Sequence, residues 1–146
     1  MDPATGLPGR TELVERLSAM LADDMSPALF AVAIHGYAEL AESHTAEADA
    51  AMREVTARLG RLVRASDVLA VLSPGVFALA GPGVEHTNTA ILIERVQGAF
   101  ALPVKVGPDA VSFPVTAGIA HPSVGIDGDS LVAEAEADLH RRLEQR

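Results

Sequence analysis

The sequence has no cysteine and no tryptophan, and four phenylalanines and one tyrosine are its only aromatic residues. Without cysteine the chain cannot form a disulfide scaffold or a thiolate metal site. So few aromatic side chains argue against a surface that stacks the bases of single-stranded nucleic acid. The net charge of −9 also argues against a general nucleic-acid surface, although a local cluster of arginines would still suit a small anionic ligand.

Long apolar runs are absent as well. No run approaches the roughly 20 residues of a membrane-spanning helix, and the N-terminus lacks the basic-then-apolar order of a signal peptide. We therefore expect a cytoplasmic protein with no membrane partner. Hydrophobic residues make up 49% of the 146 residues and are spread over the whole length, which favours one folded domain over residues 1–146.

Hydrophobic periodicity divides this domain into helices and strands. The predicted helices cover residues 11–23, 46–64, 87–100 and 130–143, with Thr11 and either Asp129 or Ser130 as N-caps. The predicted strands are 28–34, a hairpin within 67–80, 102–106 and 111–120. This order contains a β-α-β-β-α-β core, so we expect an α+β fold of the ferredoxin-like type. An N-terminal helix, a terminal strand hairpin and a C-terminal helix are added to that core.

The hairpin has an unusual turn, Ser73-Pro74-Gly75-Val76, followed by Phe77. Proline and glycine preset the backbone angles of a tight turn, and no acidic side chain is present. In the helix before the hairpin, arginines 53, 58, 61 and 64 mark the side predicted to face solvent.

Four segments together resemble the GGDEF domain, the catalytic module of diguanylate cyclases, in order and spacing. Residues 2–10 are similar to the family signature D-x-L-T-G-L-x-N-R, and 33–37 stand where the family has D-x-D-x-F. Residues 64–67 match the R-x-x-D motif at the family's spacing from the turn, and 115–120 are similar to T-x-S-x-G-x-A. The resemblance covers almost the whole chain and implies the nucleotidyl cyclase fold.

The resemblance also implies that the family's reaction is lost. Joining two GTP molecules requires carboxylates that hold divalent metal against the triphosphate. The metal-binding aspartate of the family maps to Ala33, and the two acidic positions of the signature turn map to Gly75 and Val76. The two glycines of that turn map to Ser73 and Pro74. We therefore predict an inactive diguanylate cyclase homologue with no metal site and no cofactor.

Other positions follow the same pattern. The family's guanine-reading asparagine falls at Leu40 or Ala41, and its phosphate-contacting lysine falls near Leu143. Asp49 survives as the match to the guanine-edge carboxylate.

The R-x-x-D motif remains. In the family its arginine and aspartate, with a second arginine, bind cyclic di-GMP as an inhibitor, and the resemblance assigns these positions to Arg64, Asp67 and Arg95. Arginine matches guanine O6 and N7 and pairs with phosphate, while a carboxylate accepts from the N1–H and N2–H₂ edge. Arg61 is placed to add a phosphate contact. The resemblance thus predicts a cyclic di-GMP receptor in bacterial signalling.

Three alternatives stay open. The R-x-x-D spacing also fits a surface i,i+3 ion pair of a relic site. A second function is a protein-interaction module that forms a homodimer or docks on a partner such as an active cyclase, through an apolar surface around Ala33, Pro74 and Val76. A third is GTP binding without turnover, which the missing ligands disfavour.

Overall fold

A computed structural model describes residues 5–64, 67–81, 86–106 and 108–145. The helices in these residues are α1 (Arg10–Ala22), α2 (Tyr37–Ser43), α3 (Thr45–Gly60), α4 (His86–Ala99) and α5 (Gly128–Glu144). The strands are β1 (Ala28–Ile34), β2 (Val68–Ser73), β3 (Val76–Gly81), β4 (Val104–Val106), β5 (Asp109–Val111) and β6 (Val115–Ala120). No helix in the described ranges has the length and apolar character to cross a membrane.

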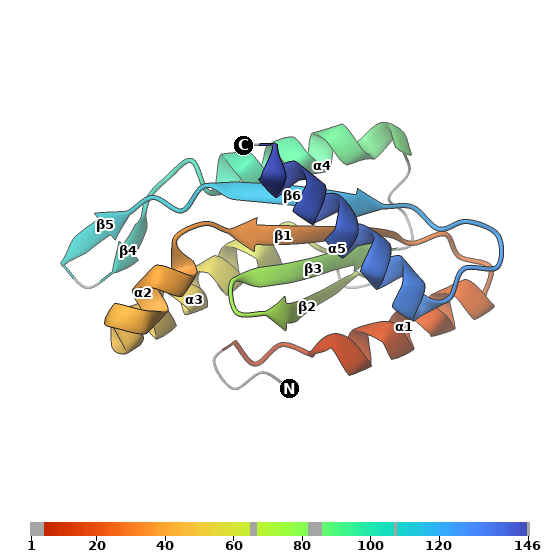
Figure 1. Ribbon diagram of the computed structural model, residues 1–146, viewed down its shortest axis with the longest axis horizontal. Coiled ribbons are helices and arrows are strands. Elements are labelled where there is room, and N and C mark those ends of the chain that lie inside the picture. The colour runs from red at the N-terminus through yellow and green to blue at the C-terminus, as the bar shows by residue number, and fades with distance from the viewer. Residues whose placement is uncertain (1–4, 65–66, 82–85, 107, 146) are drawn as a thin grey trace.

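Four strands form an antiparallel sheet in the order β2-β3-β1-β6, and β4 and β5 form a separate hairpin (Figure 1). The central strand β1 is buried along its whole length, as its continuous apolar run predicts. In its register Ala33 lies opposite both Val76 of β3 and Thr116 of β6. The predicted α+β fold is confirmed.

The pleat of the strands sends alternate side chains into two separate cores. Phe30, Val32 and Ile34 of β1 lie in the larger core with residues of α2, α3 and α4. Leu29, Ala31 and Ala33 lie in the smaller core with residues of α1 and α5. Figure 1 shows α5 crossing in front of the sheet while α3 and α4 lie behind it.

Small residues let the second helical layer approach closely. A Cβ on Gly118 of β6 would lie 2.3 Å from the backbone nitrogen of Leu139, and one on Gly128 would lie 2.8 Å from the carbonyl oxygen of Val14. The backbone of α5 therefore rests directly on β6 at one point and on α1 at another. Arg10 of α1 and Glu136 of α5 add an ion pair between these helices.

Asp138 of α5 secures the outer edge of the sheet. Its carboxylate accepts a 2.8 Å hydrogen bond from the backbone N–H of Ile119 in the edge strand β6, and it also pairs with Arg141 and Arg142. Burial alone raises the pKa of Asp138, but the hydrogen bonds from Ile119 and Arg142, together with the Arg142 charge, bring it below the ordinary 3.8.

Several predicted boundaries are wrong. The short helix α2 was not predicted; it follows Gly36, whose φ of 92° suits glycine. The predicted strand 111–120 is two strands, because residues 112–114 leave the ladder and Pro114 has no N–H to donate. Helix α1 begins at Arg10 with Gly9 as N-cap, so Thr11 is not the cap.

The N-cap of α5 is Asp127 rather than Asp129 or Ser130. Its side chain accepts a 2.7 Å hydrogen bond from the Ser130 backbone N–H, which satisfies one of the free donors at the start of the helix. Hydrogen bonding to the backbone and side chain of Ser130 lowers the pKa of Asp127.

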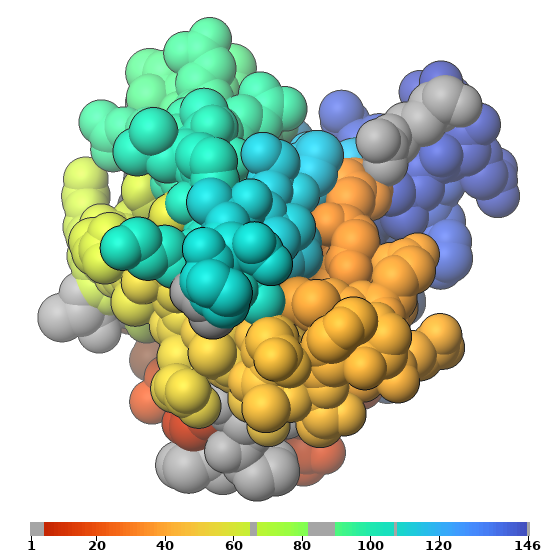
Figure 2. Space-filling view, turned by 90° about the vertical axis from the view of Figure 1, so that its left-hand side faces the viewer, coloured from red at the N-terminus to blue at the C-terminus, as the bar shows by residue number. Residues whose placement is uncertain are grey.

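Figure 2 looks at the end of the molecule that carries the β4–β5 hairpin. The hairpin covers the middle of this face, with α4 above it and α2 below it. Val104, Val106 and Phe113 from this region are buried in the larger core. The hairpin therefore closes that core at one end.

Candidate functional site

The turn between β2 and β3 is compact and tied to β1. Gly75 has a φ of 78°, and with proline before it the turn has the sequence of type II. The Gly75 carbonyl accepts a 2.8 Å hydrogen bond from Ile34 N–H, and a Cβ at Gly75 would lie 3.1 Å from the Tyr37 ring. The turn therefore closes against the end of β1.

The positions where the family resemblance places carboxylates carry only hydrocarbon. Ala33 is buried opposite Val76, and Leu72, Val76 and Leu143 are half-buried side chains that pack against the smaller core. Within the described residues no group of three histidine, aspartate or glutamate side chains is placed to hold a metal ion. This end of the hairpin offers contact to an apolar group and no oxygen ligands from those positions.

His35 follows β1 at the same end of the sheet. Its Nε2 lies 2.7 Å from the Thr116 hydroxyl, and its backbone N–H donates to the Pro114 carbonyl at 2.9 Å. The ring is half-buried. His35 therefore ties β1 to β6 beside the turn.

The apolar surface predicted around Ala33, Pro74 and Val76 is smaller than expected. Pro74 is exposed, but Ala33 is buried by the α1 and α5 layer and Val76 is half-buried. The large hydrophobic side chains that are exposed in the described part of the chain lie elsewhere, at Met25, Ile91, Leu102 and Val124.

The R-x-x-D segment lies at the opposite end of the hairpin, between α3 and β2. The Asp67 carboxylate accepts a 2.7 Å hydrogen bond from the Arg64 backbone N–H, and the Asp67 N–H donates to the Arg64 carbonyl at 3.0 Å. These reciprocal bonds hold the first and last residues of the motif together. The aspartate is held through the backbone of Arg64, so the alternative of an Arg64–Asp67 side-chain ion pair is not what the structure contains.

Gly81, at the end of β3, makes room for this carboxylate. A Cβ at Gly81 would lie 2.0 Å from Asp67 Oδ1 and 2.7 Å from its Cγ, a separation that no side chain tolerates. The hydrogen bond from Arg64 and the contact with Gly81 together fix the orientation of Asp67. Nothing in the sequence alone marks Gly81 as part of this site.

The arginines predicted for the site are exposed. Arg64 and Arg61 are exposed after α3, and Arg95 is exposed on α4. Among the described residues none of the three has a side-chain hydrogen bond or ion pair. Helices α3 and α4 pack into the same core on one side of the sheet, so Arg61 and Arg64 follow one of these helices and Arg95 lies on the other.

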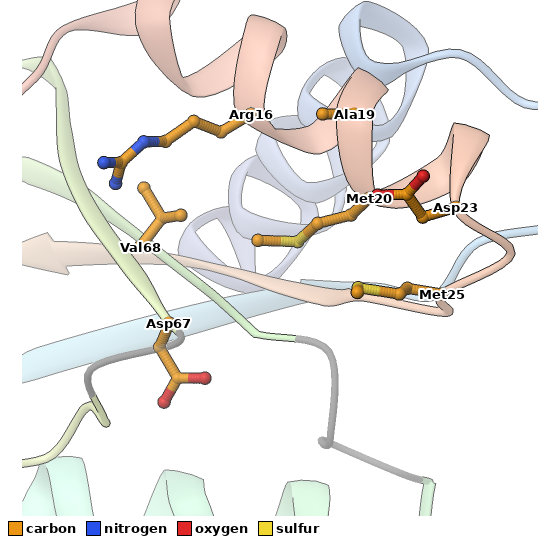
Figure 3. Close-up of a pocket in the computed structure, with 7 residues that line it drawn as sticks. All are labelled: Arg16, Ala19, Met20, Asp23, Met25, Asp67 and Val68. Carbon is orange, nitrogen blue, oxygen red and sulfur yellow. The ribbon is translucent and has the colours of Figure 1, made fainter.

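Asp67 also lines an open pocket of about 300 Å³ between α1 and the start of β2 (Figure 3). Its other lining residues are Arg16, Ala19, Met20, Asp23, Met25 and Val68. In Figure 3 the Asp67 carboxylate points away from Arg16 and Met20. The residues from α1 were not predicted, because helix periodicity shows which positions face solvent but not which strand lies beside them.

Comparison with known proteins identifies similar chains. The family model described as "Diguanylate cyclase, GGDEF domain" matches residues 1–146. A relative from Sinorhizobium fredii, the uncharacterized protein y4lL, is 28% identical over 146 residues, which is 96% of this chain. This chain spans 18% of the length of that relative.

Solved structures share the fold. A sensory box/GGDEF family protein from Caulobacter crescentus is 26% identical with a TM-score of 0.87, covering 99% of this chain and 98% of that one. The GGDEF domain of TpbB (YfiN) from Pseudomonas aeruginosa is 22% identical with a TM-score of 0.89, covering 99% and 89%. The GGDEF domain of DgcB from Caulobacter crescentus, in complex with c-di-GMP, is 19% identical with a TM-score of 0.87, covering 99% and 88%.

Proposed function

Because the chain belongs to the GGDEF family of diguanylate cyclase domains, we propose that it is an inactive member that binds cyclic di-GMP through Arg64, Asp67 and Arg95. In this proposal residues 1–146 act as a single degenerate GGDEF domain. The observation that supports it most is the contrast between the two ends of the β2–β3 hairpin: the turn carries no acidic side chain, and the other end holds an oriented carboxylate bonded to the backbone of an exposed arginine.

The loss of activity is supported by the side chains at the turn. Phosphoryl transfer in this family needs hard oxygen ligands for a divalent metal and positive charge on the triphosphate. Alanine, glycine, valine and leucine stand at positions 33, 75, 76 and 143, where the resemblance places carboxylates and a lysine. None of these side chains can supply an oxygen ligand or a charge.

Ligand binding is supported by the geometry of the R-x-x-D loop. A carboxylate that is already oriented loses little freedom when a guanine edge binds to it, so more of the contact energy is retained as affinity. The exposed guanidinium of Arg64, and that of Arg95 on the neighbouring helix, are available for guanine and phosphate oxygens. The DgcB domain, which shares the fold, was solved in complex with c-di-GMP.

Isothermal titration calorimetry with cyclic di-GMP tests the proposal. We expect saturable heat with the wild-type chain and loss of binding in Arg64→Ala, because the arginine provides the principal contacts. Arg53→Ala is the matched control, since Arg53 is exposed like Arg64 but lies within α3, 11 residues before Arg64. The absence of heat with wild-type protein at micromolar concentration would refute the receptor function.

The inactive state is tested separately by incubating the purified chain with GTP and magnesium or manganese. We expect no cyclic di-GMP. Formation of product would refute the loss of activity whatever the outcome of the titration. The protein-interaction alternative predicts instead that Val76→Asp changes the oligomeric state in light scattering while Arg64→Ala leaves it unchanged.

A further inference from the structure

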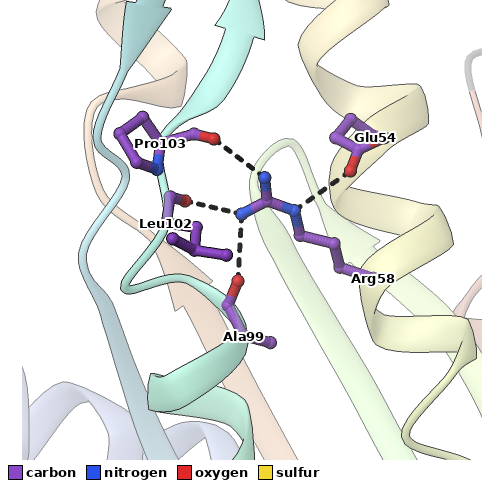
Figure 4. A network of polar contacts seen from close by, with 5 residues as sticks. All are labelled: Glu54, Arg58, Ala99, Leu102 and Pro103. Atoms are coloured by element: carbon purple, nitrogen blue, oxygen red, sulfur yellow. Dashed lines mark hydrogen bonds and ion pairs between the residues drawn. The ribbon is translucent and has the colours of Figure 1, made fainter.

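Arg58 of α3 is engaged in a way that the helical pattern does not predict. The helical pattern places Arg58 among the arginines that face solvent, but its side chain is only 12% exposed. As Figure 4 shows, its guanidinium reaches from α3 to the segment that joins α4 to β4. Nη1 donates to the carbonyls of Ala99 and Leu102 at 2.9 and 2.7 Å, and Nη2 donates to that of Pro103 at 2.9 Å.

The geometry of this contact suits the planar guanidinium of arginine. The last carbonyls of a helix have no partner within it, and Ala99 is the last residue of α4. A cation at that end interacts favourably with the helix dipole, and the planar fork donates in several fixed directions at once. Nε adds a 3.1 Å bond to Glu54, and the Phe100 ring centroid lies 5.8 Å from the guanidinium carbon. Arg58 therefore fixes the end of α4 against α3.

The contact between Arg58 and the end of α4 lies close in sequence to two residues of the proposed ligand site. Arg95 lies one helical turn before Ala99, and Arg64 lies six residues after Arg58. We propose that Arg58 is a positioning residue for cyclic di-GMP, which sets the place of Arg95 on α4 relative to Arg64 at the end of α3. This inference rests on the function proposed above and extends it to a residue that does not contact the ligand.

Two replacements separate positioning from charge. Arg58→Met keeps the apolar stem and removes the donors, while Arg58→Lys keeps the charge but not the planar fork. Arg53→Met is the matched control, because Arg53 is exposed on the same helix. Folding of each variant is checked by circular dichroism and by thermal unfolding before titration.

We expect Arg58→Met to raise the Kd for cyclic di-GMP about tenfold, with partial recovery in Arg58→Lys and no change in Arg53→Met. In an Arg95→Ala background the effect of Arg58→Met should disappear, because the residue that Arg58 positions is already gone. If Arg58 had a purely structural role, Arg58→Met would lower the thermal stability and leave the Kd for cyclic di-GMP unchanged in both the wild-type and the Arg95→Ala backgrounds.

A second measurement follows the helices directly. The chain has no cysteine, so spin labels can be attached at Ala57→Cys on α3 and Ile91→Cys on α4, both of which are exposed positions. We expect a narrow distance distribution by pulsed electron paramagnetic resonance in the parent protein and a broader or shifted one in Arg58→Met. Arg53→Met should leave the distribution as in the parent.

The outcomes distinguish this inference from the function on which it rests. If the wild-type chain does not bind cyclic di-GMP, the proposed function fails and the inference fails with it. If the wild-type chain binds and Arg58→Met binds equally well, or if its effect persists in Arg95→Ala, only the inference is overturned. An unchanged spin-label distribution in Arg58→Met also overturns it.

Discussion

The contact between Gly81 and Asp67 gives a test of the proposed ligand site that alters none of its three candidate residues, Arg64, Asp67 and Arg95. In Gly81→Ala the new Cβ would lie 2.0 Å from Asp67 Oδ1, so the carboxylate must rotate away and release the Arg64 N–H. The backbone of Gly81 does not have a positive φ, so alanine introduces no strain of its own. The effect of this replacement therefore comes through Asp67.

The magnitude follows from two opposing terms. A hydrogen bond to a charged group contributes about 1.5–3 kcal/mol to the free energy of unfolding. The half-buried Asp67 carboxylate regains some hydration when it rotates away from Arg64, so loss of this bond should lower the free energy of unfolding by about 1–2 kcal/mol. Alanine in a strand is favoured over glycine by about 0.5–1 kcal/mol. The free energy of unfolding should then fall by about 1 kcal/mol. Because Asp67 no longer faces the ligand, the Kd for cyclic di-GMP should rise about tenfold.

The Asp67→Ala background provides the decisive comparison. Without the carboxylate there is nothing to displace, so Gly81→Ala should stabilise the protein by about 0.5–1 kcal/mol. The sign of the effect on urea unfolding thus reverses between the two backgrounds. Gly98→Ala on α4 is the control, because a Cβ there meets nothing within 4 Å and should be stabilising in both. Equal destabilisation by Gly81→Ala in both backgrounds would refute the role of this contact.

Two further predictions concern the packing of α5. Gly118→Ala should lower the free energy of unfolding by about 3 kcal/mol, because its Cβ would meet the α5 backbone at Leu139 rather than a movable side chain. A decrease below ~0.5 kcal/mol in urea unfolding would contradict the close approach of α5 to β6. Asp138→Asn should cost about 1–3 kcal/mol at pH 7 through the weakened bonds to Ile119 and the two arginines. Since the folded-state pKa of Asp138 is lowered, its contribution is complete above the ordinary 3.8 and is lost as pH falls through the folded value; a difference between wild type and Asp138→Asn that stays constant from pH 7 to pH 2 would argue against it.

The sequence was sufficient for those parts of the fold that depend on local pattern. The unbroken apolar run 28–34 predicted a central strand, and Pro74-Gly75 predicted the tight turn. Helix α2 was missed because a seven-residue helix carries only two turns of periodicity and begins at a glycine in the left-handed region. The N-cap of α5 was misplaced because Asp127, Asp129 and Ser130 are all good capping residues, and only the bond to Ser130 N–H distinguishes them.

For the candidate site, too, the sequence predicted local contacts but not those made by tertiary packing. Local spacing placed Arg64 and Asp67 together, since their contact spans three residues. The role of Gly81 could not be predicted, because it depends on which strand residue ends beside Asp67. Arg58 looked solvated for a similar reason: its partners from Ala99 to Pro103 lie more than 40 residues away in the chain and reach it only through the packing of α4 on α3.

The hairpin also explains how one end of this domain can change while the other is kept. Strand β2 has six residues, so the turn at Pro74 and Asp67 are separated by about 20 Å of strand. The register from Val68–Ala80 to Val71–Phe77 is regular, and the irregularity in the ladder lies between Val71 and Ser73, next to the turn. Replacing carboxylates and glycines at the turn therefore alters only the end of the hairpin where the bulge lies. The contact between Arg64 and Asp67 depends instead on Gly81 and on the residues after α3, so under the proposed function the turn can lose its acidic side chains without loss of this contact.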